Sequence, residues 1–187
     1  MGGAGCNLGG AIWELFCVEH GIDPEGKVAK SSNSRKAART DSVSKNFFFN
    51  DKQSGKMVPR SIFLDLEPGS SLDPNKIVDE YRSPIDRIKT GACRNLFEPE
   101  QLLSHKEDAL TFGSGYYSEF IEDALDGIRK VSERCESMQG FHLFNGISGG
   151  TGSGFSSILL ERLADEYERK AKLAFSIYPT WNDNHLS

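Results

Sequence analysis

A run of glycines between a strand pattern and a helix pattern constrains this chain more than any other stretch. Residues 146–154 read Gly-Ile-Ser-Gly-Gly-Thr-Gly-Ser-Gly. The segment before them, 140–145, is short, apolar and aromatic, which predicts a buried strand. The segment after them, 155–170, places apolar residues on one side of a helix and charged residues on the other. The sequence therefore predicts a strand, a glycine loop and a helix in succession.

That order of elements is suited to binding an anion. At the start of a helix, free backbone N–H groups and the positive end of the helix dipole point the same way. Glycine lets the backbone approach a phosphate closely and adopt positive φ without penalty. Thr151 and Ser153 add hydroxyl donors. We interpret residues 146–154 as a phosphate-binding loop.

Other interpretations of the glycine run remain open. It is not a P-loop, because no Lys-Ser or Lys-Thr pair follows the glycines. The pattern Gly146-x-Ser148-x-Gly150 has the format of a hydrolase nucleophile elbow, which needs an acid and then a histidine later in the chain. Only Asp183 and His185 qualify. A connector that binds nothing is a further alternative, but it leaves the entropic cost of so many glycines unexplained.

Composition narrows the class of protein. At 187 residues the chain is one domain or part of a larger one. A net charge of −5 argues against a nucleic-acid partner. No apolar run approaches the length of a membrane span, and no secretory leader opens the chain. Since Cys6, Cys17, Cys93 and Cys135 lack metal-site spacing, we expect buried free thiols in a reducing cytosol.

A second glycine-rich segment, residues 1–10, opens the chain and predicts another loop that runs into a helix. The helix is indicated by apolar residues at helical spacing, namely Leu8, Ala11, Ile12, Leu15 and Phe16. Gly21 is placed to end this helix. The segment resembles a dinucleotide fingerprint, which requires a preceding strand, and only Met1 precedes it. We therefore expect that the first strand of the fold is missing.

The middle of the chain predicts further strands and helices. Residues 27–45 read as a basic loop, and residues 61–66 as a buried strand that ends in Asp65 and Glu67. Carboxylates at the carboxyl end of such a strand suit a metal on a bound nucleotide, although solvated loop acids explain them equally well. Helix starts with a capping residue before proline occur at residues 73–74 and 83–84.

Residues 117–135 predict a longer helix with an apolar inner face, and residues 174–178 predict the last strand. The inner-face positions are Ile121, Ala124, Leu125, Ile128 and Val131. Segments 77–83 and 85–90 look like imperfect copies of each other. Strands that alternate with helices and glycine turns favour an α/β fold with a doubly wound, mostly parallel sheet.

Several segments together resemble the tubulins and their bacterial relatives. Residues 149–154 match the glycine signature of that family, and residues 13–22, 64–68 and 96–102 are also similar to tubulin. Residues 13–22, 106–109 and 175–179 resemble the α kind more than the β or γ kinds. The resemblance covers most of the chain.

The resemblance implies a Rossmann-like GTP-binding domain, truncated at both ends, over residues 1–179, followed by an unpatterned tail at 180–187. It implies GTP and Mg²⁺ as cofactors, a β-tubulin-like subunit and the microtubule polymer as partners, and a place in the cytoskeleton and cytoplasm. Nucleic acid and membrane are not expected partners. A gene fragment would explain both truncations and the near-repeat.

The resemblance also assigns site residues by position, with no catalytic residue among them. The nucleotide-binding positions lie in four segments: Gly2, Gly3, Ala4, Gly5 and Asn7; Asp65 and Glu67; Asp108 and Ala109; and Gly146, Ser148, Gly149, Gly150, Thr151 and Gly152. Glu67 is the expected magnesium ligand.

This chain departs from the family at several of those positions. The family has glutamine where Gly3 and Asn7 stand, and serine where Gly146 stands. The asparagine expected after Ala109 is replaced by leucine or threonine. Four lost polar contacts at roughly 1 kcal/mol each would cost several kcal/mol of binding free energy. We therefore expect weak GTP binding at best. The resemblance also implies that a neighbouring subunit supplies the acid that promotes GTP hydrolysis, so we expect no GTP turnover by the chain alone.

Overall fold

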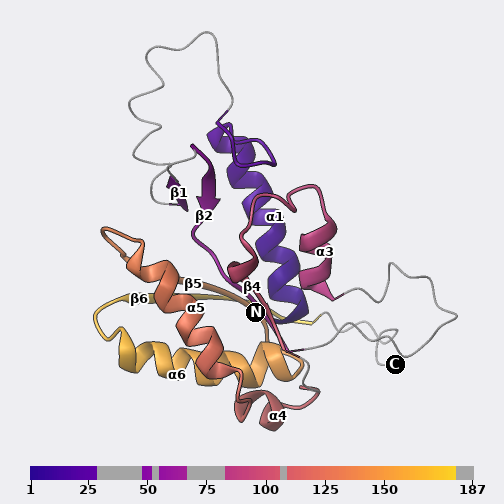
Figure 1. Ribbon diagram of the computed structural model, residues 1–187. Coiled ribbons are helices and arrows are strands. Elements are labelled where there is room, and N and C mark those ends of the chain that lie inside the picture. The colour runs from indigo at the N-terminus through magenta and orange to yellow at the C-terminus, as the bar shows by residue number, and fades with distance from the viewer. Residues whose placement is uncertain (29–47, 52–54, 67–82, 106–108, 180–187) are drawn as a thin grey trace, which may run out of the picture.

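The computed structural model describes residues 1–28, 48–51, 55–66, 83–105 and 109–179 (Figure 1). Its helices are α1 (Gly2–His20), α3 (Pro84–Thr90), η1 (Pro99–Gln101), α4 (Phe112–Tyr116), α5 (Ile121–Glu133), η2 (Gly150–Phe155) and α6 (Ser156–Glu166). Its strands are β1 (Phe49–Asp51), β2 (Met57–Pro59), β3 (Phe63–Asp65), β4 (Leu102–Ser104), β5 (Gly140–Gly146) and β6 (Ala171–Ile177). Strands and helices alternate, which confirms the predicted α/β class.

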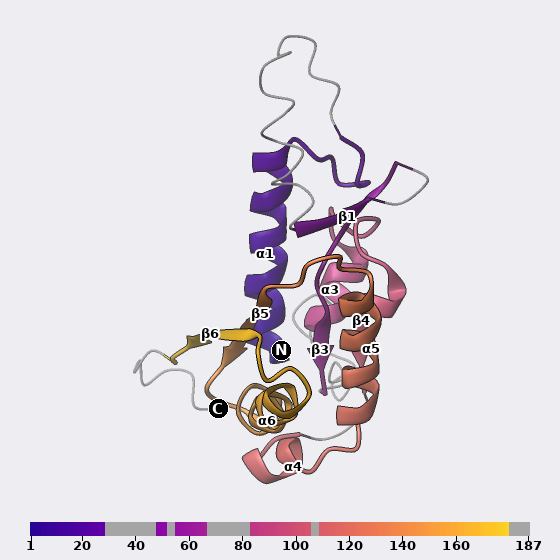
Figure 2. The ribbon, with the colours of Figure 1, turned by 90° about the vertical axis from the view of Figure 1, so that its left-hand side faces the viewer.

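Two of the three strand pairs among the described residues are parallel. β3 pairs with β4 and β5 pairs with β6, both in parallel, while β1 and β2 form an antiparallel pair. A parallel pair needs a crossover, and α6 provides it between β5 and β6. Within the described ranges no ladder joins β3 to β5. Both views place the start of α1 between these two strands (Figures 1 and 2).

The first helix corrects the prediction for residues 1–10. They do not form a loop, because α1 already begins at Gly2; Gly21 ends it as predicted, in the left-handed conformation. The buried residues of α1 are Gly2, Gly5, Cys6, Gly9, Trp13 and Cys17. Leu15, expected from the apolar spacing, is instead 55% exposed.

Close contact with the strands explains which side of α1 is buried. A Cβ on Gly5 would lie 2.2 Å from the carbonyl oxygen of Phe144 in β5, and one on Gly9 would lie 3.0 Å from the Phe63 ring in β3. Only glycine permits a helix to approach the strands so closely. Small residues therefore face the sheet, and the larger apolar residues are displaced from it.

Two apolar clusters hold the molecule together. The first contains Leu64, Leu66, Ala109, Phe120, Ile121, Ala124, Leu125, Ile128, Leu143, Phe155, Leu159 and Leu163. The second contains Cys6, Trp13, Cys17, Ile22, Phe49, Met57, Phe63, Ile85, Leu96, Phe97 and Leu102. The first cluster joins α5 and α6 to the strands, and the second packs α1 against β1 to β4. The first cluster thus fixes α6 against β5, the strand that leads into the glycine loop.

Most predicted elements are present with altered bounds. The helix predicted over 117–135 begins only at Ile121, where the predicted inner face is buried except for half-buried Val131. Ser83 caps α3 as expected by accepting a hydrogen bond from the N–H of Asp86. The strand predicted over 61–66 is shortened to β3. The basic loop, the helix start at 73–74 and the tail at 180–187 lie largely or wholly outside the described residues.

The last strand is exposed along its length, apart from half-buried Lys172. Leu173, Phe175 and Ile177 of β6 are 51%, 43% and 36% exposed. The Phe175 ring stacks on Phe144 of β5 with a centroid separation of 4.9 Å. Among the described helices, none combines the length and apolarity needed to cross a bilayer.

Candidate functional site: the glycine loop and the start of the first helix

The glycine loop follows the end of β5 and leads directly into a helix. Gly149 has φ of 77° and ψ of 162°, a conformation that side-chain-bearing residues rarely adopt. A π-helical turn, η2, then covers Gly150–Phe155 and continues without a break into α6. The predicted sequence of strand, glycine loop and helix is therefore confirmed.

Several of these glycines are also required by packing. A Cβ on Gly150 would lie 1.9 Å from the carbonyl oxygen of Ala109, and one on Gly154 would lie 2.0 Å from that of Phe112. From the other side, a Cβ on Gly115 would lie 2.1 Å from the carbonyl oxygen of Gly150. The segment from Ala109 to α4 thus packs backbone to backbone against the loop. Packing accounts for part of the glycine content that we had attributed wholly to a ligand.

The start of α1 lies against the same loop. A Cβ on Gly2 would lie 3.2 Å from the backbone nitrogen of Gly152 and 3.5 Å from the Thr151 Cβ. A Cβ on Gly146 would lie 3.4 Å from the Ala4 Cβ. Segments separated by more than 140 residues in the sequence therefore meet here, as the residue assignments required.

Two helix starts, those of α1 and η2, converge at this place. The first N–H groups of α1 and of η2 have no partner within their own helix. Neither helix has an acidic residue in its first turn. The arrangement concentrates N–H donors and the positive ends of two helix dipoles, which favours an anion.

The hydroxyl groups of Thr151 and Ser153 differ in their hydrogen bonding. Thr151 is 2% exposed, and its Oγ1 is buried without a hydrogen-bond partner among the described residues. A buried polar atom in a folded protein almost always has a partner, so this hydroxyl is available to a ligand. Ser153 was also predicted to donate to a phosphate. Its Oγ instead donates to the carbonyl oxygen of Gly149.

Asp65 lies at the carboxyl end of β3 and is 1% exposed. Burial, above all, raises the pKa of the neighbouring Cys6 thiol to about 11, and the charge of Asp65 contributes to the increase. Glu67, the expected magnesium ligand, and Asp108, an expected nucleotide contact, lie outside the described residues. Within the described part no group of three acidic, histidine or cysteine side chains could hold a metal. A single carboxylate fits Mg²⁺, which is usually held by one or two carboxylates plus substrate phosphates.

Two assigned residues lie apart from the loop. A Cβ on Gly3 would contact Pro84 of α3 at 3.4 Å. Asn7, one helical turn further on, lines a groove of about 270 Å³ between α1 and α3. These residues therefore lie on the side of α1 that faces α3, away from Thr151 and Gly152.

The arrangement at Ser148 does not resemble a nucleophile elbow. Such a serine sits on a strained turn, yet no non-glycine residue in the described part has positive φ. Ser148 is exposed, and both residues proposed as its partners lie outside the described ranges.

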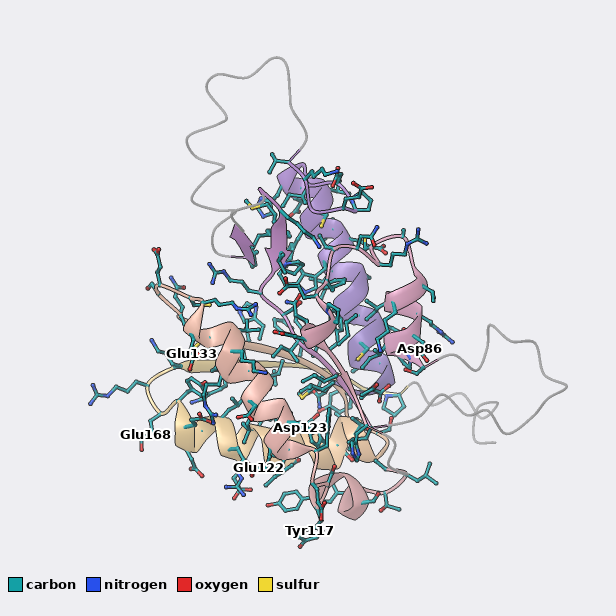
Figure 3. The ribbon with its side chains drawn as sticks, in the orientation of Figure 1. Asp86, Tyr117, Glu122, Asp123, Glu133 and Glu168 are labelled. Atoms are coloured by element: carbon teal, nitrogen blue, oxygen red, sulfur yellow. The ribbon has the colours of Figure 1, made fainter. Side chains whose placement is uncertain are left out.

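The exposed carboxylates of Glu122, Asp123 and Glu133 are spread along α5 rather than gathered in one place (Figure 3).

One contact of the loop was missed from the sequence. Asn145, the residue before Gly146, donates from Nδ2 to the carbonyl oxygen of Gly152 over 2.8 Å. Its Oδ1 accepts a hydrogen bond from Ser176 Oγ over 3.0 Å. A polar residue at the end of an otherwise apolar strand, directly before the loop, was the available signal.

Comparisons with known proteins identify the family of the chain. Residues 1–186 match the model of the Tubulin/FtsZ family, GTPase domain. The chain is 46% identical over 184 residues to the tubulin alpha-2 chain of Eleusine indica and 45% identical over 184 residues to the nucleomorph tubulin alpha chain of Guillardia theta. These alignments cover 96% of this chain but only 37% of each relative. The hydrolase and dinucleotide alternatives find no support here, and the chain belongs to the Tubulin/FtsZ family, within its GTPase domain.

Proposed function

We propose that the chain binds GTP, with the triphosphate held between the start of α1 and the glycine loop. The contact between Gly2 and Gly152 carries this proposal, because it brings two uncapped helix starts to one place. The identity of the nucleotide is inferred from the family, because the matching family model is that of a GTPase domain.

Each part of the site has a distinct role in this proposal. The N–H groups of Gly150, Thr151 and Gly152 donate to phosphate oxygens, and the buried Thr151 hydroxyl adds a further donor. N–H groups at the start of α1 donate from the other side. Glu67 would be the direct ligand of the metal that accompanies the nucleotide, and Asp65, two residues before it, would add a second carboxylate near that metal. Bound Mg²⁺ would neutralise charge on the phosphates.

We further propose that the chain serves as an α-tubulin-like structural subunit, in contact with a β-tubulin-like subunit within a microtubule. The sequence similarity to two α-tubulin chains supports this role. The chain alone is expected not to turn GTP over, because the family resemblance assigns the activating acid to a neighbouring subunit. Phosphate release from GTP should then stay at the rate measured without protein.

Equilibrium binding of a fluorescent GTP analogue, with Mg²⁺ present, tests the proposed nucleotide site. Thr151→Ala removes the buried hydroxyl and should raise the dissociation constant about tenfold, as expected for a hydrogen bond to a charged group. Ser157→Ala is the matched control, because its exposed hydroxyl bonds only to the carbonyl oxygen of Ser153. Absence of saturable GTP binding by the unaltered chain would refute the proposal.

A further inference from the structure

The side chain of Asn145 connects the glycine loop to the end of β6. Its Nδ2 donates to the carbonyl oxygen of Gly152 over 2.8 Å and lies 3.4 Å from that of Gly146. Its Oδ1 accepts from Ser176 Oγ over 3.0 Å. Asn145 and Ser176 are register partners in the parallel β5–β6 pair. The amide therefore lies between the second strand of the pair and the middle of the loop.

The orientation of this amide is determined by its partners. Both carbonyl oxygens can only accept hydrogen bonds, so the nitrogen of the amide must face them. The hydroxyl of Ser176 can donate, and it meets the remaining oxygen. The two carbonyl oxygens thus exclude the flipped orientation, in which the amide oxygen would oppose the Gly152 carbonyl, and the Ser176 hydroxyl holds the amide oxygen at the other end.

Gly152 has an unusual need for such a contact. It lies within a loop that has four glycines between residues 149 and 154, whose backbones have the widest conformational freedom. No side chain can anchor it, since a Cβ at Gly152 would lie 2.4 Å from the carbonyl oxygen of Gly146. A hydrogen bond to its carbonyl restrains the peptide planes on either side, including the N–H groups at the start of η2.

We propose that Asn145, oriented by Ser176, is a positioning residue for the phosphate-binding loop. It touches no phosphate itself. It holds the Gly152 peptide so that the N–H groups of Thr151 and Gly152 are directed at the anion before the nucleotide arrives. Restraining a glycine-rich loop in its bound conformation strengthens binding by removing an ordering cost. This role rests on the proposed nucleotide site.

Asn145→Ala tests the role through nucleotide affinity. Loss of one loop-restraining hydrogen bond should raise the dissociation constant for the fluorescent GTP analogue about five- to tenfold. His142→Ala is the matched control, because His142 is exposed on the same strand and its ring packs against Phe175 of β6 rather than against the loop. An Asn145→Ala dissociation constant equal to that of His142→Ala would overturn the proposal while leaving the nucleotide site intact.

A double-mutant cycle separates positioning from general stabilisation. Ser176 acts only through Asn145, so adding Ser176→Ala to Asn145→Ala should weaken GTP binding no further. Ser176→Ala alone should weaken binding by a smaller factor than Asn145→Ala. Additive effects of the two substitutions would contradict the proposed chain of contacts.

Hydrogen exchange in the nucleotide-free chain tests the same role without GTP. Amides in a peptide covering residues 147–155 should exchange faster in Asn145→Ala than in His142→Ala, while peptides from α5 stay unchanged. If the unaltered chain binds no GTP, the proposed function fails, and this measurement still decides on the loop restraint. Equal exchange of the loop in both variants would overturn it.

Discussion

Substituting Gly150 by alanine is the sharpest perturbation of the glycine loop. The added Cβ would lie 1.9 Å from the carbonyl oxygen of Ala109 and 2.6 Å from that of Thr111. Real Cβ contacts stay beyond 3.0 Å, and backbone atoms cannot rotate away. The loop and the segment before α4 must therefore separate. Overpacking of a closed site lowers the free energy of unfolding by about 1–3 kcal/mol. We expect Gly150→Ala near the upper end of that range, because the added Cβ meets backbone oxygens of two residues, Ala109 and Thr111.

Two other glycines give matched controls. Gly113 has nothing within 4 Å of an added Cβ and lies in α4, so Gly113→Ala should raise stability by about 0.5–1 kcal/mol. Gly21 also has free space but has φ of 62°, so Gly21→Ala should cost about 1–2 kcal/mol through its left-handed conformation alone.

Urea unfolding followed by circular dichroism measures the free energy of unfolding of the unaltered chain and of the three variants. The expected order of stability is Gly113→Ala, then the unaltered chain, then Gly21→Ala, then Gly150→Ala. In thermal unfolding each kcal/mol corresponds to a shift of about 2–4 °C for a chain of this size. If Gly150→Ala is as stable as Gly113→Ala, the backbone contact between Ala109 and the loop does not exist in solution.

Three further predictions follow from burial and exposure. Burial raises the pKa of the Cys6 thiol from 9.0 to about 11, so between pH 9 and 11 the thiol loses its proton more readily in the unfolded chain. The free energy of unfolding should therefore fall over that range, by at most about 1.4 kcal/mol per pH unit from this thiol. Cys6→Ala should make the pH dependence less steep. A fluorophosphonate probe should leave Ser148 unlabelled; stoichiometric labelling lost in Ser148→Ala would restore the hydrolase. The exposed Leu173 and Phe175 should bind ANS, and Leu173→Asp with Phe175→Asp should reduce its fluorescence; unchanged fluorescence would show that β6 is covered.

Elements with a regular apolar period were predictable from the sequence. The α5 positions Ile121, Ala124, Leu125 and Ile128 are all buried, since a polar opposite face leaves only one side to pack. The Ser83 cap of α3 was equally readable, because its chemistry is local.

The buried side of α1 could not be predicted by the same rule. Apolar spacing pointed to Leu15, whereas glycines at positions 5 and 9 face the strands. A hydrophobic period is read from large apolar side chains, so it does not detect glycines that allow a helix backbone to lie close to a strand. The pairing of α1 with both β3 and β5 is a long-range contact, so it appears only in three dimensions.

Only the part of the candidate site that is local in the sequence could be predicted. Strand, loop and helix are adjacent in sequence, so their order was evident. The packing of Gly150 against Ala109 and the amide contact from Asn145 to Gly152 join different segments or depend on one side chain. Neither has a sequence period. The free hydroxyl of Thr151 and the occupied hydroxyl of Ser153 could be distinguished only from the hydrogen bonds.

Competition for the bound fluorescent GTP analogue tests the central claim most directly, because it separates phosphate recognition from base recognition. In the proposed site the N–H groups at Gly2 and at Gly150 to Gly152 bind the triphosphate. Tripolyphosphate should therefore displace the analogue from the unaltered chain. Guanosine at the same concentration should displace it far less. Displacement by guanosine with no effect of tripolyphosphate would show that the glycine loop is not a phosphate site.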